Sequence, residues 1–191
     1  MTIEKERKTK ETDIVLSLDV EGQGQGDIDT GIGFFDHMLE SFAKHGTMNL
    51  KIRCKGDTYV DDHHSVEDVG IVLGQAFREA VFPIEGVERF GHAVVVMDEA
   101  AVECALDLSN RPYLVYALDV HDKVGQFDTE LVEEFFKAFA FNAGITLHLV
   151  QRRGSNRHHI VEAAFKACAV ALRHALAPNA RTGVPSTKGI L

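Results

Sequence analysis

The chain has 191 residues, of which 45% are hydrophobic, enough to bury a core as one domain or as two small fused units. Its net charge of −9 argues against a nucleic-acid partner, because binding along a phosphate backbone needs a broad basic surface. The cysteines, Cys54, Cys104 and Cys168, lie far apart in apolar runs and indicate buried thiols in a reducing compartment. No stretch has the pattern of a secretory signal or a membrane span, so we expect a cytoplasmic protein without a membrane partner.

The first half of the chain alternates between strand and helix patterns. Apolar residues alternate from 11 to 20, which predicts a half-buried strand, and Ile28 is expected to begin a short return strand. The glycines at 22–26 between them predict a hairpin turn; a phosphate cradle is the less favoured alternative, because no P-loop lysine follows. A helix is then predicted over 34–44, a strand over 48–54, and a second helix that Asp61 or Asp62 caps and that ends before Pro83.

The second half repeats this order. Residues 92–108 are strand-like with a break predicted at Met97–Asp98, and residues 112–120 predict another strand. Asp128 is expected to cap a helix that runs to Phe141. A strand is predicted over 146–150, and Asn156 is expected to cap a last helix that ends before Pro178.

The two halves also share a motif. His63-His64-Ser-Val-Glu67 recurs as His158-His159-Ile-Val-Glu162, 95 positions later. The helices that carry the motif align without a gap, and the preceding helices align with a shift of 97. We therefore predict one domain made by duplication of a β-β-α-β-α unit, with repeats at about 11–85 and 91–178 and a tail at 179–191. The predicted fold class is α+β, with two pseudo-twofold units that are each a sheet covered on one face by two helices.

The repeated motif has the spacing of a metal site. On a helix, residues three or four apart lie on one face, so either histidine can share a cation with the glutamate. Adjacent histidines point roughly 100° apart, because a helix has about 3.6 residues per turn, so one motif suits two metals better than one. A single copy has a plain alternative as a solvated helix start with a favourable first-turn carboxylate. Two copies in register favour a two-metal site, since this many polar groups without a cation would be poorly satisfied.

His37 and Glu134 are the next candidate ligands. They fall opposite one another in the repeat, so both can face the site from the preceding helix. The alternatives are a hydrogen-bonded core histidine at 37 and, beside Glu133, a turn that is simply acidic. His148 lies between two leucines of a predicted strand and is interpreted as structural. Histidine and carboxylate ligands without cysteine suit Mn²⁺, Fe²⁺ or Zn²⁺, in a site with open positions for a ligand or a reaction.

Nearly the whole chain resembles the imidazoleglycerol-phosphate dehydratase family of histidine biosynthesis, in its form without a fused phosphatase domain. Besides the two histidine motifs, the resemblance rests on TGIGFFDHML (30–39), DDHHSVED (61–68), MDEA (97–100), DLSNRPY (107–113) and PSTKG (185–189), in that order. It implies a two-layer α/β sandwich of the ribosomal protein S5 domain 2-like type. It also implies a hydro-lyase that removes water from D-erythro-imidazole glycerol phosphate to give imidazole acetol phosphate.

The resemblance further assigns roles to individual residues. It implies two Mn²⁺ ions per active site, with the ligands His37, His63, His64, Glu67, His158, His159 and Glu162. Several relatives have histidine at the position of Glu134, so Glu134, His148 or a water molecule is expected to supply the remaining metal ligand. The phosphate-binding positions of the family are matched by Arg89, Arg111, Ser186 and Lys188. The family's large, hollow, cubic-symmetry oligomers imply a homo-oligomer of roughly 24 subunits with active sites between subunits.

The chemistry of the residues is compatible with this activity. Two cations flanking the substrate's imidazole could stabilise an imidazolate, whose electron density would help to expel a hydroxyl from the attached chain. A general acid must protonate the leaving hydroxide, and a base must remove the neighbouring C–H proton. Glu11 matches a substrate-contacting carboxylate of the family, and it or a metal-bound water is our candidate for one of these steps. Asn110 stands where glycine is expected, which alters only a turn.

Two other functions compete with the dehydratase. A dinuclear metallohydrolase would use a metal-bound hydroxide on a phosphate ester and would release phosphate. A metal-storage or metal-dependent assembly protein would use the repeated motifs as metal sites that link one subunit to another. The cationic residues also have plain alternatives, namely a surface pair of Arg89 with Glu85 or Glu88 and a loose tail at Lys188.

Overall fold

The computed structural model describes residues 1–181 and 183–189; the last two residues of the predicted tail, 190 and 191, lie outside the described residues. The first half runs β1 (Thr2–Lys8), β2 (Thr12–Asp19), β3 (Gly26–Asp29), α1 (Gly33–Gly46), β4 (Asn49–Gly56) and α2 (His63–Val81). The second half runs β5 (Phe90–Met97), β6 (Ala100–Asp107), β7 (Tyr113–Ala117), a short hairpin of β8 (Lys123–Val124) and β9 (Phe127–Asp128), α3 (Glu130–Ala143), β10 (Thr146–Arg153) and α4 (Arg157–Ala175).

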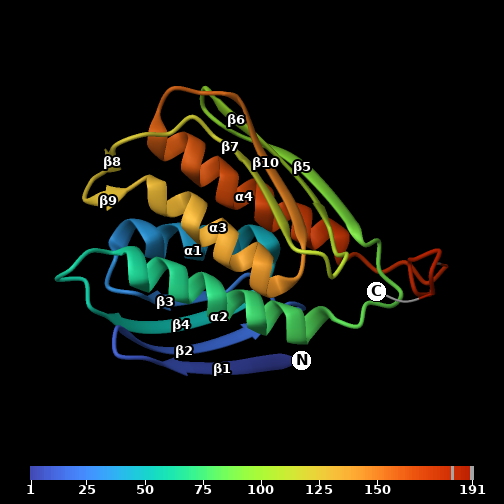
Figure 1. Ribbon diagram of the computed structural model, residues 1–191. Coiled ribbons are helices and arrows are strands. Elements are labelled where there is room, and N and C mark those ends of the chain that lie inside the picture. Colours follow the sequence, from blue (N-terminus) through green and yellow to red (C-terminus); the bar gives the residue numbers. More distant parts are fainter. Residues whose placement is uncertain (182, 190–191) are drawn as a thin grey trace.

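Two four-stranded sheets with the same topology form the outer layers. Their strand orders are β1-β2-β4-β3 and β5-β6-β10-β7, and in each sheet only the last pair, β3 with β4 or β7 with β10, is parallel. Figure 1 shows the four helices between the two sheets, so each half is a sheet covered on one face by two helices. The architecture confirms the predicted α+β fold, and the matching sheets fit the predicted duplication.

The halves join through their helices, where α2 packs on α3 and α1 on α4. The fully buried ring of Phe135 on α3 lies 5.4 Å from Phe35 of α1 and 5.1 Å from Phe165 of α4, so one aromatic cluster links three helices. Gly70 of α2 permits the close approach of α3, because an added Cβ there would lie 2.9 Å from the Phe135 carbonyl oxygen. The core of the molecule is therefore at the helix layer shared by the two halves.

Most predicted elements are found with small shifts of their ends. Ile14, Leu16 and Leu18 of β2 are fully buried in alternation, as predicted, and the break near Asp98 is the turn between β5 and β6. The Asn156 side chain caps α4 by accepting a hydrogen bond from the His159 backbone N–H at 3.3 Å.

The structure corrects three expectations. The glycines at 22–26 do not form a hairpin turn, because β4 lies between β2 and β3 in the sheet. The unit is β-β-β-α-β-α, because β1 precedes the strand predicted at 11–20 and completes the edge of the first sheet. Asp128 does not cap α3: it pairs with Lys123 in the β8–β9 hairpin, and Thr129 occupies the N-cap position. Within the described residues, no helix is long and apolar enough to cross a membrane.

Candidate metal centre and anion cleft

The second histidine motif lies in the first turn of α4, where it meets α1. The Glu162 Oε2 atom lies 3.1 Å from Nε2 of His158 and 3.5 Å from Nε2 of His37. Potential ligand atoms of these three side chains lie within 4.8 Å of one another, which makes them the only such group of three or more found among the described residues. The four-residue spacing of His158 and Glu162 therefore places imidazole and carboxylate on one helix face, as expected, and α1 adds His37.

Glu162 is a buried carboxylate, 6% exposed, that keeps its charge through its neighbours. Burial by itself would raise the pKa of Glu162, but Lys166, whose Nζ lies 2.6 Å from Oε1, and the nearby histidines hold it below its ordinary value. Lys166 is a site residue that the sequence reasoning missed. The sequence could have identified Lys166, because it follows Glu162 by four residues and therefore lies on the same helix face.

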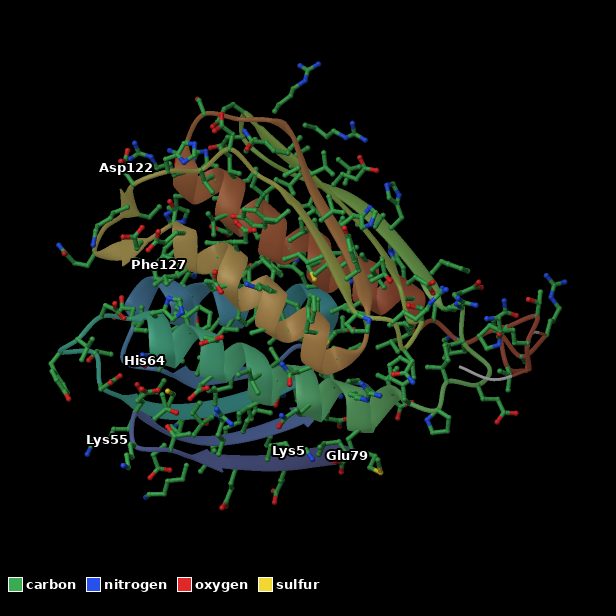
Figure 2. The ribbon with its side chains drawn as sticks, in the orientation of Figure 1. Lys5, Lys55, His64, Glu79, Asp122 and Phe127 are labelled. Atoms are coloured by element: carbon green, nitrogen blue, oxygen red, sulfur yellow. The ribbon has the colours of Figure 1, made fainter. Side chains whose placement is uncertain are left out.

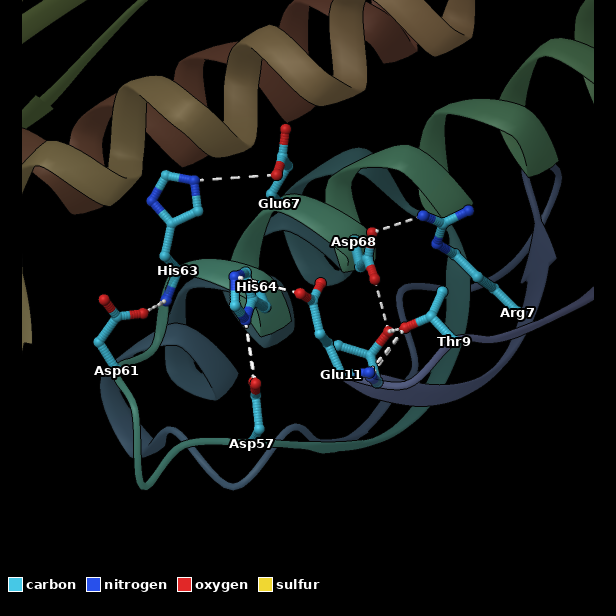
Figure 3. Close-up of polar contacts among 10 residues, drawn as sticks. Arg7, Thr9, Glu11, Asp57, Asp61, His63, His64, Glu67 and Asp68 are labelled. Carbon is cyan, nitrogen blue, oxygen red and sulfur yellow. Dashed lines mark hydrogen bonds and ion pairs between the residues drawn. The ribbon is translucent and has the colours of Figure 1, made fainter.

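The first histidine motif opens α2 in the same way but forms a looser group. His63 Nε2 lies 3.8 Å from Glu67 Oε2, and Figure 3 shows the pair on one face of the helix. Glu134, which the repeat places opposite His37, lies 3.9 Å from Lys137 on its own helix. His148 is exposed on β10, on the face opposite the buried Leu147 and Leu149.

The second histidine of each motif pairs with carboxylates from outside its helix. His64 Nδ1 lies 3.1 Å from both Asp57 carboxylate oxygens, and its Nε2 lies 3.7 Å from Glu11 Oε1. The hydrogen bond to Asp57 raises the pKa of His64 above its ordinary value. His63 and His64 thus have different partners, with ring centroids 6.2 Å apart, as expected of adjacent histidines on a helix.

His159 has a similar environment at the turn between β5 and β6. Its Nδ1 lies 2.7 Å from Glu99 Oε2, and its Nε2 lies 3.8 Å from Asp98 Oδ2. The hydrogen bond to Glu99 raises the pKa of His159. Hydrogen bonds from His159 and from the backbone N–H groups of Asn156 and Ser155 lower the pKa of Glu99 to about 2.

Hydrogen bonds fix the turn that carries Glu11, between β1 and β2. The Glu11 N–H donates to Thr9 Oγ1 at 3.0 Å, and the Glu11 carbonyl oxygen accepts from the Asp57 N–H at 3.0 Å. Thr12 anchors the turn on α2 through a 2.5 Å hydrogen bond to the buried carboxylate of Asp68. The Glu11 carboxylate is therefore held beside His64 while its side chain stays accessible.

A separate cleft collects the predicted anion-binding residues. It has a volume of about 390 Å³ and is lined by Arg89, Ser109, Asn110, Arg111, Ser186, Thr187 and Lys188. Asn110 adopts a φ of 53°, in the left-handed region that favours glycine and asparagine, which explains how it replaces the expected glycine.

The two arginines of the cleft share a partner that the sequence reasoning missed. Asp107, rather than Glu85 or Glu88, is the carboxylate paired with Arg89. Asp107 also lies 3.5 Å from Arg111. Because Arg89 is only 13% exposed, this pair is shielded from water more than an ordinary surface pair.

The cleft and the histidine motif on α4 lie at opposite ends of that helix. The Arg89 N–H donates to the carbonyl oxygen of Ala175, the last residue of α4, whereas His159 lies in its first turn. At about 1.5 Å per residue, positions 159 and 175 are roughly 24 Å apart along the axis. In Figure 2, His64 of the motif on α2 also lies at the end of the molecule away from the C-terminal segment.

The donor set fits the metal that the sequence suggests. Imidazole nitrogens and carboxylate oxygens converge at the helix starts, and Cys54, Cys104 and Cys168 are buried elsewhere as free thiols. Such ligands suit Mn²⁺ and related divalent ions rather than a closed thiolate zinc site.

Known proteins resemble the chain in sequence and in structure. The model of the imidazoleglycerol-phosphate dehydratase family matches residues 30–172. Imidazoleglycerol-phosphate dehydratase of a Nitratiruptor species is 68% identical over 97% of this chain and 98% of its own length. The imidazoleglycerol-phosphate dehydratase of Sulfurimonas denitrificans is 66% identical over 99% of this chain and 100% of its own length. The crystal structure of imidazoleglycerol-phosphate dehydratase from Staphylococcus aureus superposes with a TM-score of 0.85 at 40% identity, covering 94% of this chain and all of that one. The chain therefore belongs to the imidazoleglycerol-phosphate dehydratases, the hydro-lyases of histidine biosynthesis.

Proposed function

We propose that the chain dehydrates D-erythro-imidazole glycerol phosphate to imidazole acetol phosphate in a metal-dependent reaction, with two Mn²⁺ ions in each active site. The observation that carries this proposal is the convergence of His37, His158 and Glu162 within 4.8 Å, at one of two motifs with identical spacing. The ligands of the two ions would come from His37, His63, His64, Glu67, His158, His159 and Glu162. Glu134 stays a candidate for one further metal-ligand position. It lies on α3, the helix that corresponds in the repeat to α1, which carries His37. Bound Mn²⁺ would supply Lewis acidity that stabilises negative charge on the substrate's ring.

The chain's own residues have distinct tasks in this proposal. Arg89, Arg111, Ser186 and Lys188 would bind the phosphate, for which guanidinium groups offer fork-shaped donors. The Glu11 carboxylate would move one proton, either from the C–H group next to the leaving hydroxyl or to that hydroxyl as it departs. The enol that results from loss of water becomes the ketone product by moving a proton from oxygen to carbon.

We also propose that the active sites lie between subunits of a large, symmetric homo-oligomer, roughly a 24-mer. The distance of roughly 24 Å along α4 supports this proposal, because a metabolite of one small ring, three carbons and one phosphate is far shorter. In one chain, the anion cleft and the histidine motif on α4 cannot hold the same substrate molecule. A second subunit that brings its cleft to the histidines of the first would solve this problem.

Metal-stripped protein reloaded with Mn²⁺ and given imidazole glycerol phosphate tests the reaction. Ketone formation that depends on Mn²⁺, without phosphate release, is the expected result. Phosphate release would indicate a hydrolase, and tight metal binding without turnover would indicate a storage or assembly protein.

Mixing two inactive variants tests the shared site. Arg89→Ala damages the cleft and His159→Ala damages the histidine motif, so co-assembled subunits would form some sites with both parts intact. Recovery of activity in the mixture is expected. No recovery, although mass measurements show mixed oligomers, would contradict sites between subunits.

A further inference from the structure

Two carboxylates that the ligand set above does not use hold the second histidine of each motif. Asp57 contacts His64, and Glu99 contacts His159, in both cases at Nδ1 and with no more than 3.1 Å between the atoms. The first histidines, His63 and His158, instead direct Nε2 toward the glutamate of their own helix. The two carboxylates therefore act on equivalent positions of the two repeats.

We propose that Asp57 and Glu99 are positioning residues that fix the orientation and the tautomer of His64 and His159, so that each ring presents an unprotonated Nε2 to a cation. An ionised carboxylate can only accept a hydrogen bond, so a neutral histidine paired with it must carry its proton on Nδ1. The lone pair then lies on Nε2, the atom that faces Glu11 at His64 and Asp98 at His159. Outer carboxylates of this kind raise the basicity of a metal-binding imidazole. This inference rests on the proposed metal dependence.

Each carboxylate is itself held in place by the fold. Glu99 Oε1 accepts the Asn156 and Ser155 N–H groups at 2.8 and 3.1 Å, just before α4, which leaves Oε2 for the imidazole. Asp57 is 14% exposed, and its N–H donates to the Glu11 carbonyl oxygen. A histidine held by such a partner pays little further ordering entropy when it binds a cation.

The carboxylates that contact Nδ1 of the two histidines come from different segments of the repeat. Glu11 directly precedes β2 and Glu99 directly precedes β6, so they are counterparts in the two hairpins. Glu99 engages Nδ1 of its histidine, whereas Asp57 takes Nδ1 of His64 and leaves Glu11 facing Nε2 (Figure 3). Asp57 thereby frees Glu11 for the side of the ring that a metal and a substrate would occupy.

Mn²⁺ binding to the metal-stripped, full-length protein tests the inference, with free Mn²⁺ followed by electron paramagnetic resonance. Asp57→Asn and Glu99→Gln should each weaken Mn²⁺ binding by about 10- to 100-fold. Asp119→Asn is the matched control, because it removes a carboxylate 2.9 Å from His121 in an exposed pair outside both histidine motifs.

Comparison of two substitutions at position 99 separates positioning from a merely structural role. Glutamine keeps the oxygen that accepts the Asn156 and Ser155 N–H groups, but its amide donates to Nδ1 and so favours the tautomer with the proton on Nε2. Glu99→Gln should therefore bind Mn²⁺ no better than Glu99→Ala, while the metal-free protein keeps its melting temperature. A merely structural role predicts the reverse order, with glutamine close to wild type.

Mn²⁺ affinity that is unchanged in Asp57→Asn and Glu99→Gln, or that falls only as far as the metal-free protein is destabilised, would overturn the inference. If the wild type itself binds no Mn²⁺, the proposed metal dependence fails and this inference fails with it. Tight wild-type binding that the substitutions do not affect would overturn the inference alone.

Discussion

Asp107 accepts two hydrogen bonds from the guanidinium group of Arg89, from Nε at 2.7 Å and from Nη2 at 3.1 Å. The third guanidinium nitrogen, Nη1, donates to the Pro185 carbonyl oxygen at 2.7 Å, directly before Ser186 of the cleft. One carboxylate thus fixes an arginine that also ties down the C-terminal segment. Asp107 lies 3.5 Å from Arg111 as well, so the two arginines of the cleft share one carboxylate partner.

Asp107→Asn should weaken substrate binding. The lost negative charge would by itself favour an anion. Asparagine keeps only one accepting oxygen, however, so loss of one charge-assisted hydrogen bond, worth about 1.5–3 kcal/mol, loosens Arg89 and the Ser186 segment. We expect the disordering to dominate and KM to rise about tenfold. Steady-state kinetics would measure KM, with Asp119→Asn as the control variant. A lower KM in Asp107→Asn would show that the lost charge dominates instead.

Arg111→Ala should reduce substrate binding far more than metal binding. Arg111 is 73% exposed in the cleft, at the far end of α4 from the histidine motif, so its loss leaves the metal ligands intact. Arg111→Lys keeps the charge without the fork-shaped donors and should fall between alanine and wild type. Titrations with Mn²⁺ and with substrate separate the two affinities. Equal losses of both would refute a phosphate-binding role.

Glu11→Gln should lower turnover by about 10²- to 10⁴-fold if this carboxylate transfers a proton. Glutamine has the same shape, and the backbone hydrogen bonds to Thr9 and Asp57 do not involve the side chain. Mn²⁺ content and the melting temperature should therefore match wild type. Near-normal turnover in a variant that still holds its metal would reduce Glu11 to a substrate contact.

The parts of the site that are local in sequence could be predicted. The i,i+4 spacing alone places His63 beside Glu67 and His158 beside Glu162, and the repeat brings His37 to the same group. Asp57, Glu99 and Asp107 escaped prediction because turns and strand ends bring them to their partners. The break at Met97–Asp98 was predicted, but the φ of 48° that Asp98 adopts in this turn was not.

The missed strand has a physical reason as well. Of the residues in β1, TIEKERK, only Ile3 is buried, so the alternation of apolar residues that marks a half-buried strand is absent. Polar contacts hold this edge strand instead. Lys5 pairs with Glu79 of α2, as Figure 2 indicates, and Arg7 pairs with the buried Asp68 at 3.0 Å. Charged residues are typical of edge strands, because they discourage pairing with other chains.

Alkaline pH should destabilise the fold through Cys54. Burial raises the pKa of the Cys54 thiol from 9.0 to about 11. Because the raised pKa belongs to the folded state, this contribution to stability is complete below pH 9.0 and is lost as the pH rises toward about 11. One such group lowers the free energy of unfolding by at most about 1.4 kcal/mol per pH unit.

Urea unfolding across this window should show a shallower decline in the free energy of unfolding for Cys54→Ala than for wild type. Part of the decline should persist, because burial also raises the pKa values of Cys104 and Tyr116. Val94→Ala, which removes an exposed side chain without a titrating group, should decline like wild type, and an equal slope in Cys54→Ala would contradict the assignment.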